Sequence, residues 1–494
     1  MKNKNKIILI FCVMSLTVFG KKLGVENEIK KIELNDKGVS NIKTLNSSQE
    51  IARASILPKA DPESVGFSKE GLEKVDQLIQ QEVTAGFPGA VLLIVKDGKI
   101  VKNTAYGYAK KYDSTGKVLE NPEKMETTKL FDMASNTKMY ATNYAIMKLV
   151  SEGKINIESR VAEYIPEYGG EGREKILVKD LLTHSAGYAP EVKFFEPEAT
   201  QVVSKDFEYP LGQNFYSIEK SKTEKIIIRD VPLDYERGTK TVYSDTDYML
   251  LGIIVEKVTD QSLDEYVENE IYKPLGLNNT MYNPLKKGKV PSDAAATELA
   301  GNTRDGYINF PGIRTNVIQG DVHDEKAYYS MDGVSGHAGL FSTSEDLAVL
   351  MSAMLNDGMI GNTRLFNKNV IDQFTKASEK DITYGLGWRR AGENNLTETF
   401  GTLASPQAIG HTGWTGTVTV IDPKYNLEIV LLTNKKHSSV IKNLREKNGK
   451  LNVNKFQGDI YETGKYGEVI TKIYEAFLDK NKANEKPAVK AIKK

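Results

Sequence analysis

The stretch that decides the fold is Phe131-Asp-Met-Ala-Ser-Asn-Thr-Lys-Met139, which begins with apolar residues and precedes a periodic apolar segment that ends at Val150. This pattern predicts that a helix opens here. One helical turn would then place the Ser135 hydroxyl and the Lys138 ammonium on the same face. At that spacing the amine can take the proton of the hydroxyl, which makes Ser135 a candidate nucleophile.

The Ser-x-x-Lys pattern is weak by itself. It also begins at five other serines, Ser40, Ser114, Ser151, Ser217 and Ser439. Only the copy at Ser135 combines an apolar run before it with helical periodicity after it. The alternative interpretation is a polar helix cap at Ser135 and a solvated Lys138. Other motifs of the chain therefore have to decide between a catalytic pair and a helix cap with a solvated lysine.

The charge balance excludes several classes of partner. The 494 residues contain 66 Lys and Arg and 66 Asp and Glu, so the formal net charge is zero. No global field attracts nucleic acid or anionic lipid, and a small neutral or zwitterionic substrate fits better. The single cysteine, Cys12, lies near the N-terminus, and the five histidines lack ligand-like spacing. We therefore expect no disulfide, no metal and no cofactor.

Residues 1–20 resemble an export signal, because Lys2, Lys4 and Lys6 precede an apolar run. The run is shorter than the about 20 residues that span a bilayer, which favours a cleaved signal over an uncleaved inner-membrane anchor. Either outcome limits membrane contact to this segment and predicts an exported protein of the periplasm or cell envelope. Residues 21–58 are predicted to be a polar tether, residues 59–478 the folded domain, and residues 479–494 a disordered tail.

Periodicity predicts an α/β fold of the α+β kind, an antiparallel sheet flanked by helices beside a mostly helical domain. A helix capped by Ser68 and ended by Gly86 precedes a β-hairpin. The predicted helices cover residues 68–83, 155–168, 176–188, 248–259, 263–275, 340–355 and 466–478. The predicted strands cover residues 90–95, 100–105, 384–389, 408–412, 415–422 and 428–433. Residues 189–240 are weakly periodic and form either a functional lid or a surface insertion.

Two further motifs strengthen the interpretation of Ser135. Thr241-Val-Tyr243-Ser244-Asp245 places a tyrosine and an acid just before a predicted helix, and Ala408-Ile-Gly-His411-Thr412-Gly413-Trp414 lies on a predicted strand. In this order, Ser-x-x-Lys, Tyr-x-Asp and His-Thr-Gly resemble the three motifs of the penicillin-recognising serine hydrolases. One such motif occurs readily by chance, whereas three in this order indicate a related protein.

The resemblance is closest to the class C β-lactamase and DD-peptidase family, peptidase family S12, and to its penicillin-binding protein 4B type of D-alanyl-D-alanine carboxypeptidase. It covers nearly all of residues 60–478. Supporting segments are residues 181–187, 230–239, 296–306, 320–327, 333–342 and 384–388. The resemblance implies a β-lactamase/DD-peptidase-like fold with the active site between the sheet and the helical domain. It also implies an exported serine hydrolase that acts on peptidoglycan-derived peptides or β-lactams through an acyl-enzyme.

The resemblance assigns roles to eight residues. Ser135 would attack a carbonyl carbon, while Lys138 and Tyr243 exchange protons with the attacking and leaving groups. The backbone N–H groups of Ser135 and Trp414 would form the oxyanion hole. The substrate-binding residues would be Asp245, His411, Thr412, Gly413 and Trp414, with Thr412 on the substrate carboxylate or carbonyl.

Two departures from the family pattern leave alternatives open. Asp245 stands where many relatives have asparagine, and a carboxylate there should hold a proton on Lys138. His411 stands where lysine is usual, which weakens the attraction for a terminal carboxylate. The alternatives are an esterase or a muramyl-peptide amidase of the same fold, or a catalytically silent penicillin-binding protein. His184 and His337 are interpreted as structural, and residues 322–324 as either pocket-lining or a buried loop.

Overall fold

The computed structural model describes residues 57–170, 172–197, 215–393, 396–447 and 449–484. The predicted export signal at residues 1–20 and the tether up to residue 56 lie outside these ranges. So do residues 198–214 of the predicted lid or insertion and residues 485–494 of the predicted tail. Within the described ranges, no helix is both long enough and apolar enough to cross a membrane.

A seven-stranded antiparallel sheet forms the centre of the folded domain, as predicted. Its order is β3-β2-β1-β12-β11-β10-β9, so strands from the two ends of the chain meet where β1 pairs with β12. The strands are β1 (Gly89–Lys96), β2 (Lys99–Tyr112), β3 (Val118–Lys124), β9 (Arg389–Arg390), β10 (Ile409–Thr412), β11 (Thr417–Asp422) and β12 (Leu427–Thr433). This order places β10, with the predicted His-Thr-Gly motif, near one edge.

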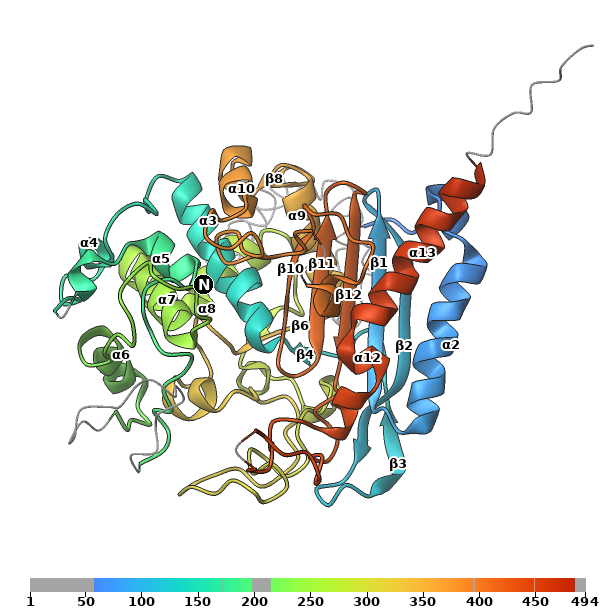
Figure 1. Ribbon diagram of the computed structural model, residues 1–494, viewed down its shortest axis with the longest axis horizontal. Helices are drawn as coiled ribbons and strands as arrows, with labels where there is room; N and C mark the ends of the chain where they lie inside the picture. The colour runs from blue at the N-terminus through green and yellow to red at the C-terminus, as the bar shows by residue number, and fades with distance from the viewer. Residues whose placement is uncertain (1–56, 171, 198–214, 394–395, 448, 485–494) are drawn as a thin grey trace, which may run out of the picture. The chain divides into compact units, whose positions relative to one another are not determined.

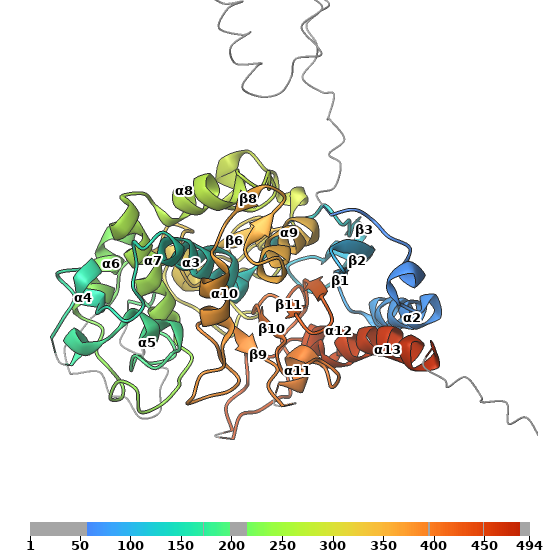
Figure 2. The same ribbon diagram turned by 90° about the horizontal axis from the view of Figure 1, so that it is seen from above.

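Both faces of the sheet are covered, and strand β1 shows why. Every residue of β1 is buried, and its side chains alternate between two apolar clusters. Ala90, Leu92 and Ile94 pack with α2 (Lys69–Ala85) and α13 (Gly467–Asn484). The alternate residues of the strand join the other cluster, with α3 (Tyr144–Ser151), α7 (Asp245–Thr259) and α9 (Ser344–Leu355). Figure 1 shows α2 and α13 on one side of the sheet and these helices on the other, and Figure 2 shows the same layers from above.

The first and last helices behave as their sequence predicts. Ser68 caps α2 by accepting the N–H of Gly71 at 3.1 Å, and Gly86 ends the helix with a φ of 128°. The predicted hairpin of β1 and β2 and the packing of α13 on α2 are also confirmed. The tail was predicted to begin at residue 479, and this is wrong for its first turn because α13 continues to Asn484.

A mostly helical part lies beside the sheet, and it has less helix than predicted. Its main helices are α3 (Tyr144–Ser151), α6 (Lys220–Arg229), α7 (Asp245–Thr259), α8 (Leu263–Val267), α9 (Ser344–Leu355) and α10 (Lys368–Thr375). The shorter elements are α4 (Val161–Tyr164), α5 (Val178–Leu182), α11 (Thr397–Phe400), α12 (Glu462–Lys465), β4 (Phe131–Asp132), β5 (Met281–Tyr282), β6 (Leu340–Ser342), β7 (Met359–Ile360) and β8 (Thr363–Arg364).

The predicted helices at residues 155–168 and 176–188 exist only as the short α4 and α5. Asn156 accepts the N–H of Glu158 at 3.0 Å and so closes a turn before α4, and Pro166 prevents its continuation. After α5, His184 has a left-handed φ of 52°, which a helix cannot contain. Local turn chemistry therefore overrides the helical periodicity here.

Two other predicted elements are shorter than expected. Residues 340–342 form strand β6, paired with β4 and β5, and Thr343 then caps α9 through the N–H of Asp346. The strand predicted at residues 384–389 is reduced to β9. Tyr384 instead bridges to Arg389 across a turn in which Gly387 has a φ of 84°.

Candidate active site

Ser135 lies in a tight turn that joins strand β4 to helix α3. A 3₁₀ turn of Ala134–Asn136 and a π-helical turn of Lys138–Asn143 precede the regular helix. Ala134 has a left-handed φ of 44°, an unusual conformation for a residue with a side chain. Its N–H donates to Asp132 at 2.8 Å, and the second oxygen of Asp132 accepts the N–H of His323 at 2.6 Å. The helix predicted to open at Ser135 is present, and the buried Asp132 fixes its first turn.

The predicted nucleophile and its predicted bases lie together. Lys138 Nζ is 3.0 Å from Ser135 Oγ, 2.9 Å from Asp245 Oδ1 and 4.8 Å from the centre of the Tyr243 ring. It also donates to the backbone carbonyl of His337 at 3.2 Å, and its side chain is fully buried. Three sequence segments, residues 131–139, 241–245 and 333–342, therefore meet around one ammonium group.

Strand β10 and the turn after it are held against the Ser135 turn. A side chain on Gly413 would lie 2.5 Å from the carbonyl of Met133, so only glycine allows this approach. Thr415 Oγ1 donates to the carbonyl of Asp132 at 2.7 Å, and Thr417 Oγ1 to that of Met133 at 3.2 Å. The predicted His-Thr-Gly-Trp segment thus borders the hydroxyl of Ser135, and its residues line the same cavity.

His411 is a neutral, buried imidazole at the wall of this cavity. Burial lowers its pKa to about 3, and the charge of Lys138 contributes to the shift. Its Nδ1–H donates to the carbonyl of Thr412 at 2.7 Å, while Nε2 is buried and meets no partner among the described residues. The strand therefore has a neutral side chain at the position where a cation is usual.

The protonation of Lys138 and Tyr243 is coupled. Burial lowers the pKa of Lys138, but the charges of Asp245 and Tyr243 raise it more, so it stays above its ordinary value. Burial also raises the pKa of Tyr243, although the charge of Lys138 and hydrogen bonds to Lys138 and Ser135 oppose the rise. At neutral pH the resting site therefore holds an ammonium and a phenol, and the pair loses its proton only as the pH rises.

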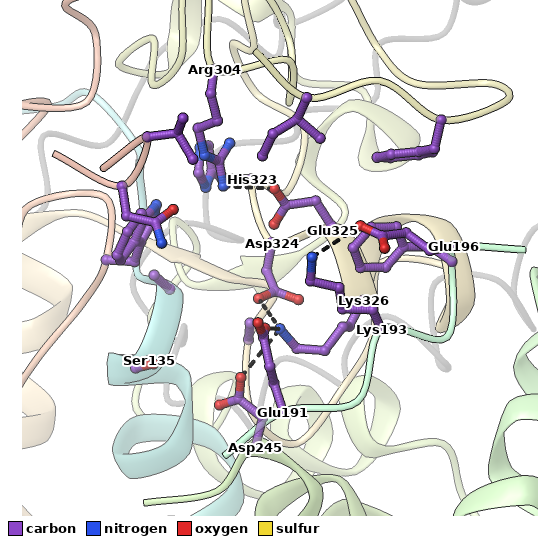
Figure 3. Close-up of a pocket in the computed structure, with 18 of the residues that line it drawn as sticks. Ser135, Glu191, Lys193, Glu196, Asp245, Arg304, His323, Asp324, Glu325 and Lys326 are labelled. Carbon is purple, nitrogen blue, oxygen red and sulfur yellow. Dashed lines mark hydrogen bonds and ion pairs between the residues drawn. The ribbon is translucent and has the colours of Figure 1, made fainter. Parts of the chain in front are cut away.

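A second buried lysine extends this cluster. Lys326 Nζ lies 3.1 Å from Glu191 Oε2 and 3.3 Å from both Asp245 Oδ2 and Asp324 Oδ2. The opposite oxygen of Asp324 is 2.8 Å from His337 Nε2. Figure 3 shows Lys326 between these carboxylates, beside the turn that carries Ser135. Burial and the neighbouring carboxylate of Asp324 raise the pKa of Asp245, but the charges of Lys138 and Lys326, with a contribution from His337, lower it more and keep Asp245 ionised.

Two cavities meet at Ser135 and share Tyr243 and Trp414 as walls. The first, of about 350 Å³, is lined by both signs of charge and by aromatic rings, including Glu191, Phe195, Arg304, Phe310, Asp324 and Lys326. The second, of about 580 Å³, is mainly basic and includes Arg389, His411, Thr412, Lys435, Lys436 and Lys455. Trp414 is 39% exposed, and Lys436 Nζ lies 4.1 Å from the centre of its ring. A substrate can thus extend to both sides of the hydroxyl.

One group of side chains has the geometry of a possible cation site. Asp245, Asp324 and His337 each bring one ligand atom within 4.8 Å of the others. The ammonium of Lys326 already lies 3.3 Å from both carboxylates and supplies the positive charge between them. The donor set therefore fits an ion pair with lysine better than a divalent cation, which would have to displace this ammonium.

Sequence reasoning found the residues around Ser135 but missed Lys326, Arg389 and the role of His337. His337 was interpreted as structural, yet its carbonyl contacts Lys138 and its ring orients Asp324. The segment at residues 322–324 was left between a pocket wall and a buried loop, and it is both, since His323 is buried and both it and Asp324 line the first cavity. The sequence signals for this cluster were the segments at residues 320–327 and 333–342, which supported the family resemblance without assigning a role to Lys326.

A serine, a lysine and a tyrosine at the border of an antiparallel sheet and a helical domain are the arrangement of penicillin-recognising serine hydrolases. The model of the β-lactamase family matches residues 75–451. The chain therefore belongs to the β-lactamase family.

Curated relatives and solved structures agree with this family. A Bacillus subtilis (strain 168) protein named "N-acetylmuramyl-L-alanine amidase" is 52% identical over 428 residues, 85% of this chain and 92% of the relative. An Escherichia coli (strain K12) protein named "Putative D-alanyl-D-alanine carboxypeptidase" is 49% identical over 435 residues, 87% of this chain and 96% of the relative. A solved penicillin-binding protein homologue from Caulobacter crescentus has the same fold, with a TM-score of 0.56 at 20% identity, covering 83% of this chain and 99% of that one. The predicted family and fold are thus confirmed.

Proposed function

We propose that the chain is a serine hydrolase that cleaves an amide bond of peptidoglycan-derived peptides through an acyl-enzyme on Ser135, as a D-alanyl-D-alanine carboxypeptidase. The observation that carries this proposal is the 3.0 Å contact between Ser135 Oγ and the buried Lys138 Nζ, next to Tyr243. The name of the Escherichia coli relative supports the choice of bond. Family members act on amide and lactam carbonyls, for which this arrangement is suited.

In the proposed mechanism the Lys138–Tyr243 pair moves the protons. The pair first loses one proton to solvent, then accepts the proton of Ser135 as the hydroxyl attacks the carbonyl carbon, and then donates that proton to the leaving amine as the amide bond breaks. The N–H groups of Ser135 and Trp414 would bind the developing oxyanion, and each such donor is worth about 3 kcal/mol of barrier. Water then hydrolyses the ester and releases the acid.

The basic cavity supports recognition of a terminal carboxylate in spite of the neutral His411. Arg389 lines this cavity on strand β9 and stacks on Tyr384, with its guanidinium 4.2 Å from the ring centre. In the described part of the chain, no carboxylate forms an ion pair with Arg389. We propose that this guanidinium, together with Thr412, binds the carboxylate of the leaving D-alanine by charge-assisted hydrogen bonds.

A second candidate bond is the amide between the lactyl group of muramic acid and L-alanine. Two observations favour it: a relative of 52% identity is named for this bond, and the cavities on both sides of Ser135 are large enough for more than one amino acid on either side. The same serine, lysine and tyrosine would cleave it, because both reactions transfer an acyl group from an amide. The two candidates differ only in which groups occupy the cavities.

A muramyl pentapeptide distinguishes the two candidates, because it contains both bonds. The carboxypeptidase releases free D-alanine and leaves a muramyl tetrapeptide, whereas the amidase releases the intact pentapeptide with a free L-alanine amine. Mass spectrometry of the products identifies the bond directly. Release of neither product, together with an adduct on Ser135, would favour a catalytically silent penicillin-binding protein, and failure to form any adduct as well would favour a scaffolding protein of the same fold.

We also propose that the protein is exported to the cell envelope, with residues 1–20 as a signal or anchor and residues 21–58 as a tether. The substrate supports this, since peptidoglycan is built outside the cytoplasm, and the sequence of residues 1–20 is typical of a signal. N-terminal sequencing of the purified protein tests it. A mature chain that begins after residue 20 supports a cleaved signal, and a chain that retains Met1 in the membrane fraction supports an anchor.

A further inference from the structure

Lys326 is a buried cation that the mechanism above does not use. Its side chain is 5% exposed, and it contacts the carboxylates of Glu191, Asp245 and Asp324 at 3.1 to 3.3 Å. A buried ammonium loses its hydration, and three carboxylates compensate for that loss. Because these charges outweigh burial, the pKa of Lys326 lies well above its ordinary value, and the group stays charged.

The carboxylate of Asp245 is shared between two ammonium groups. Its Oδ1 lies 2.9 Å from Lys138 Nζ, and its Oδ2 lies 3.3 Å from Lys326 Nζ. An unshared carboxylate at 2.9 Å would hold the proton on Lys138 strongly, because charges interact more strongly in a buried site than in water. A second cation on the same carboxylate opposes that effect.

The two lysines are members of one closed ring of contacts. Asp324 holds Lys326 from the side opposite Asp245, and its other oxygen meets the ring of His337 at 2.8 Å. The backbone carbonyl of His337 accepts from Lys138 at 3.2 Å. The ring therefore runs from Lys138 through Asp245, Lys326, Asp324 and His337 back to Lys138, and it fixes Lys326 relative to the reacting hydroxyl.

We infer that Lys326 is a positioning residue of this active site: its ammonium offsets part of the charge of Asp245 and so eases the release of the Lys138 proton that lets this lysine assist Ser135. The inference rests on the proposed function only in requiring that Ser135 is the acylated group. It does not depend on which amide bond is cleaved. Since Asp245 stands where many relatives have the neutral amide of asparagine, Lys326 reduces the difference in charge that Lys138 experiences between the two residue types.

Several other groups face Lys138 and are unchanged by substitutions at Lys326. They are Ser135, His184, Tyr243, Asp247, Tyr248, the carbonyl of His337, and His411. His184 and His411 have lowered pKa values from burial and from the charge of Lys138, so both are neutral at pH 7. Asp247 is held protonated by burial and by the neighbouring carboxylates. A change in proton release after substitution of Lys326 is therefore attributable to the carboxylates that Lys326 contacts, Asp245, Asp324 and Glu191, and to their effect on Lys138.

The test compares Lys326→Met and Lys326→Arg in the natural protein and in the Asp245→Asn background. The measurement is the rate of acylation of Ser135 by a fluorescent penicillin between pH 5 and pH 10. A nearby opposite charge moves a pKa by about 1 to 3 units, so we expect Lys326→Met to slow acylation by about tenfold or more at pH 7. The acid limb of the profile should move to higher pH by about one unit or more.

Combining Lys326→Met with Asp245→Asn distinguishes an electrostatic role of Lys326 from a role in packing alone. In the Asp245→Asn background, Lys326→Met should change the rate several-fold less than in the natural protein, because the carboxylate that lies between the two ammonium groups is gone, although Glu191 and Asp324 remain. Lys326→Arg should leave the acid limb of the pH profile of acylation at the same pH as in the natural protein, because arginine retains the positive charge. The matched control is Lys102→Met, which removes another largely buried, carboxylate-paired lysine that lies far from the site in the fold, on β2, and should leave the profile unchanged.

A direct titration keeps the inference testable if penicillin does not react. Nitrogen-15 NMR of the lysine side chains, with Lys138 assigned through Lys138→Arg, should show the Lys138 titration at higher pH in Lys326→Met than in the natural protein. The inference is overturned if Lys138 titrates at the same pH in Lys326→Met as in the natural protein. It is also overturned if Lys326→Met slows acylation equally with aspartate and with asparagine at position 245. Absence of any Ser135 adduct with an unchanged fold would instead contradict the proposed function, and the NMR titration would still decide the role of Lys326.

Discussion

Glu428 provides a sharp test of the energetics of the sheet. It lies on β12 opposite Val95 and Ile421, and its Oε1 accepts from Ser352 Oγ of α9 at 2.6 Å. Its Oε2 is buried and has no partner among the described residues. Burial raises the pKa of Glu428 from 4.5 to about 8, so the folded protein holds this carboxyl protonated at neutral pH.

The pKa shift fixes the sign and size of the effect of Glu428→Gln. The folded pKa lies above the unfolded pKa, so the free energy of unfolding is highest below pH 4.5 and falls as the pH rises toward 8. The slope is about 1.4 kcal/mol per pH unit, and the cost of keeping the proton at pH 7 is about 3 kcal/mol. Glutamine keeps the shape and the contact with Ser352 but does not titrate.

Urea unfolding at pH 5 and pH 7 measures the effect. The stability of Glu428→Gln relative to the natural protein should rise by about 2 to 3 kcal/mol between these two pH values. The control Glu73→Gln, at an exposed position of α2, should change stability by less than about 0.5 kcal/mol at both. A difference between Glu428→Gln and the natural protein that stays constant with pH would refute the reasoning that burial holds this carboxyl neutral.

Three further predictions concern the active site. Tyr243→Phe should lower the rate of Ser135 acylation by about 10² to 10⁴-fold without a comparable loss of stability, measured with a fluorescent penicillin and thermal unfolding. Because the pKa of Lys138 is raised, the acylation rate of the natural protein should rise with pH through the neutral range, by up to about tenfold per unit, and a rate that falls over this range would contradict the coupling. Arg389→Met should raise KM for a D-alanyl-D-alanine peptide by about tenfold or more and leave a neutral ester substrate nearly unaffected, since it removes a charge-assisted contact to a carboxylate. An equal rise in KM for the peptide and for the ester would show that Arg389 does not bind the substrate carboxylate.

Local signals predicted a large part of the fold. Helix α2 has apolar residues at helical spacing between a serine cap and a glycine stop, and β1 and β2 are joined by a short turn of Asp97-Gly98. Each signal lies within a few residues of the element that it specifies. The errors occur where turn chemistry competes with periodicity, as at Asn156 and Pro166, or where a short apolar run such as residues 340–342 fits a strand as well as a helix.

The site was predictable only where its residues belong to short motifs. Ser135 and Lys138 are one turn apart, and Tyr243 and His411 lie in recognisable patterns, so their resemblance to a known family was visible. Lys326 lies in a segment, residues 320–327, that supports the resemblance but contains none of the three catalytic motifs. Its position between Asp245 and Asp324 depends on the packing of a loop far along the chain, which single-sequence reasoning does not provide. The low pKa of His411 likewise depends on burial that only the folded structure shows.

The central claim is that Ser135 forms the acyl-enzyme, and intact-mass measurement after incubation with a β-lactam tests it most directly. We expect one adduct of the mass of the β-lactam, located on the peptide that contains Ser135, and no adduct in Ser135→Ala. An adduct on another residue, or an adduct that persists in Ser135→Ala, would contradict the account.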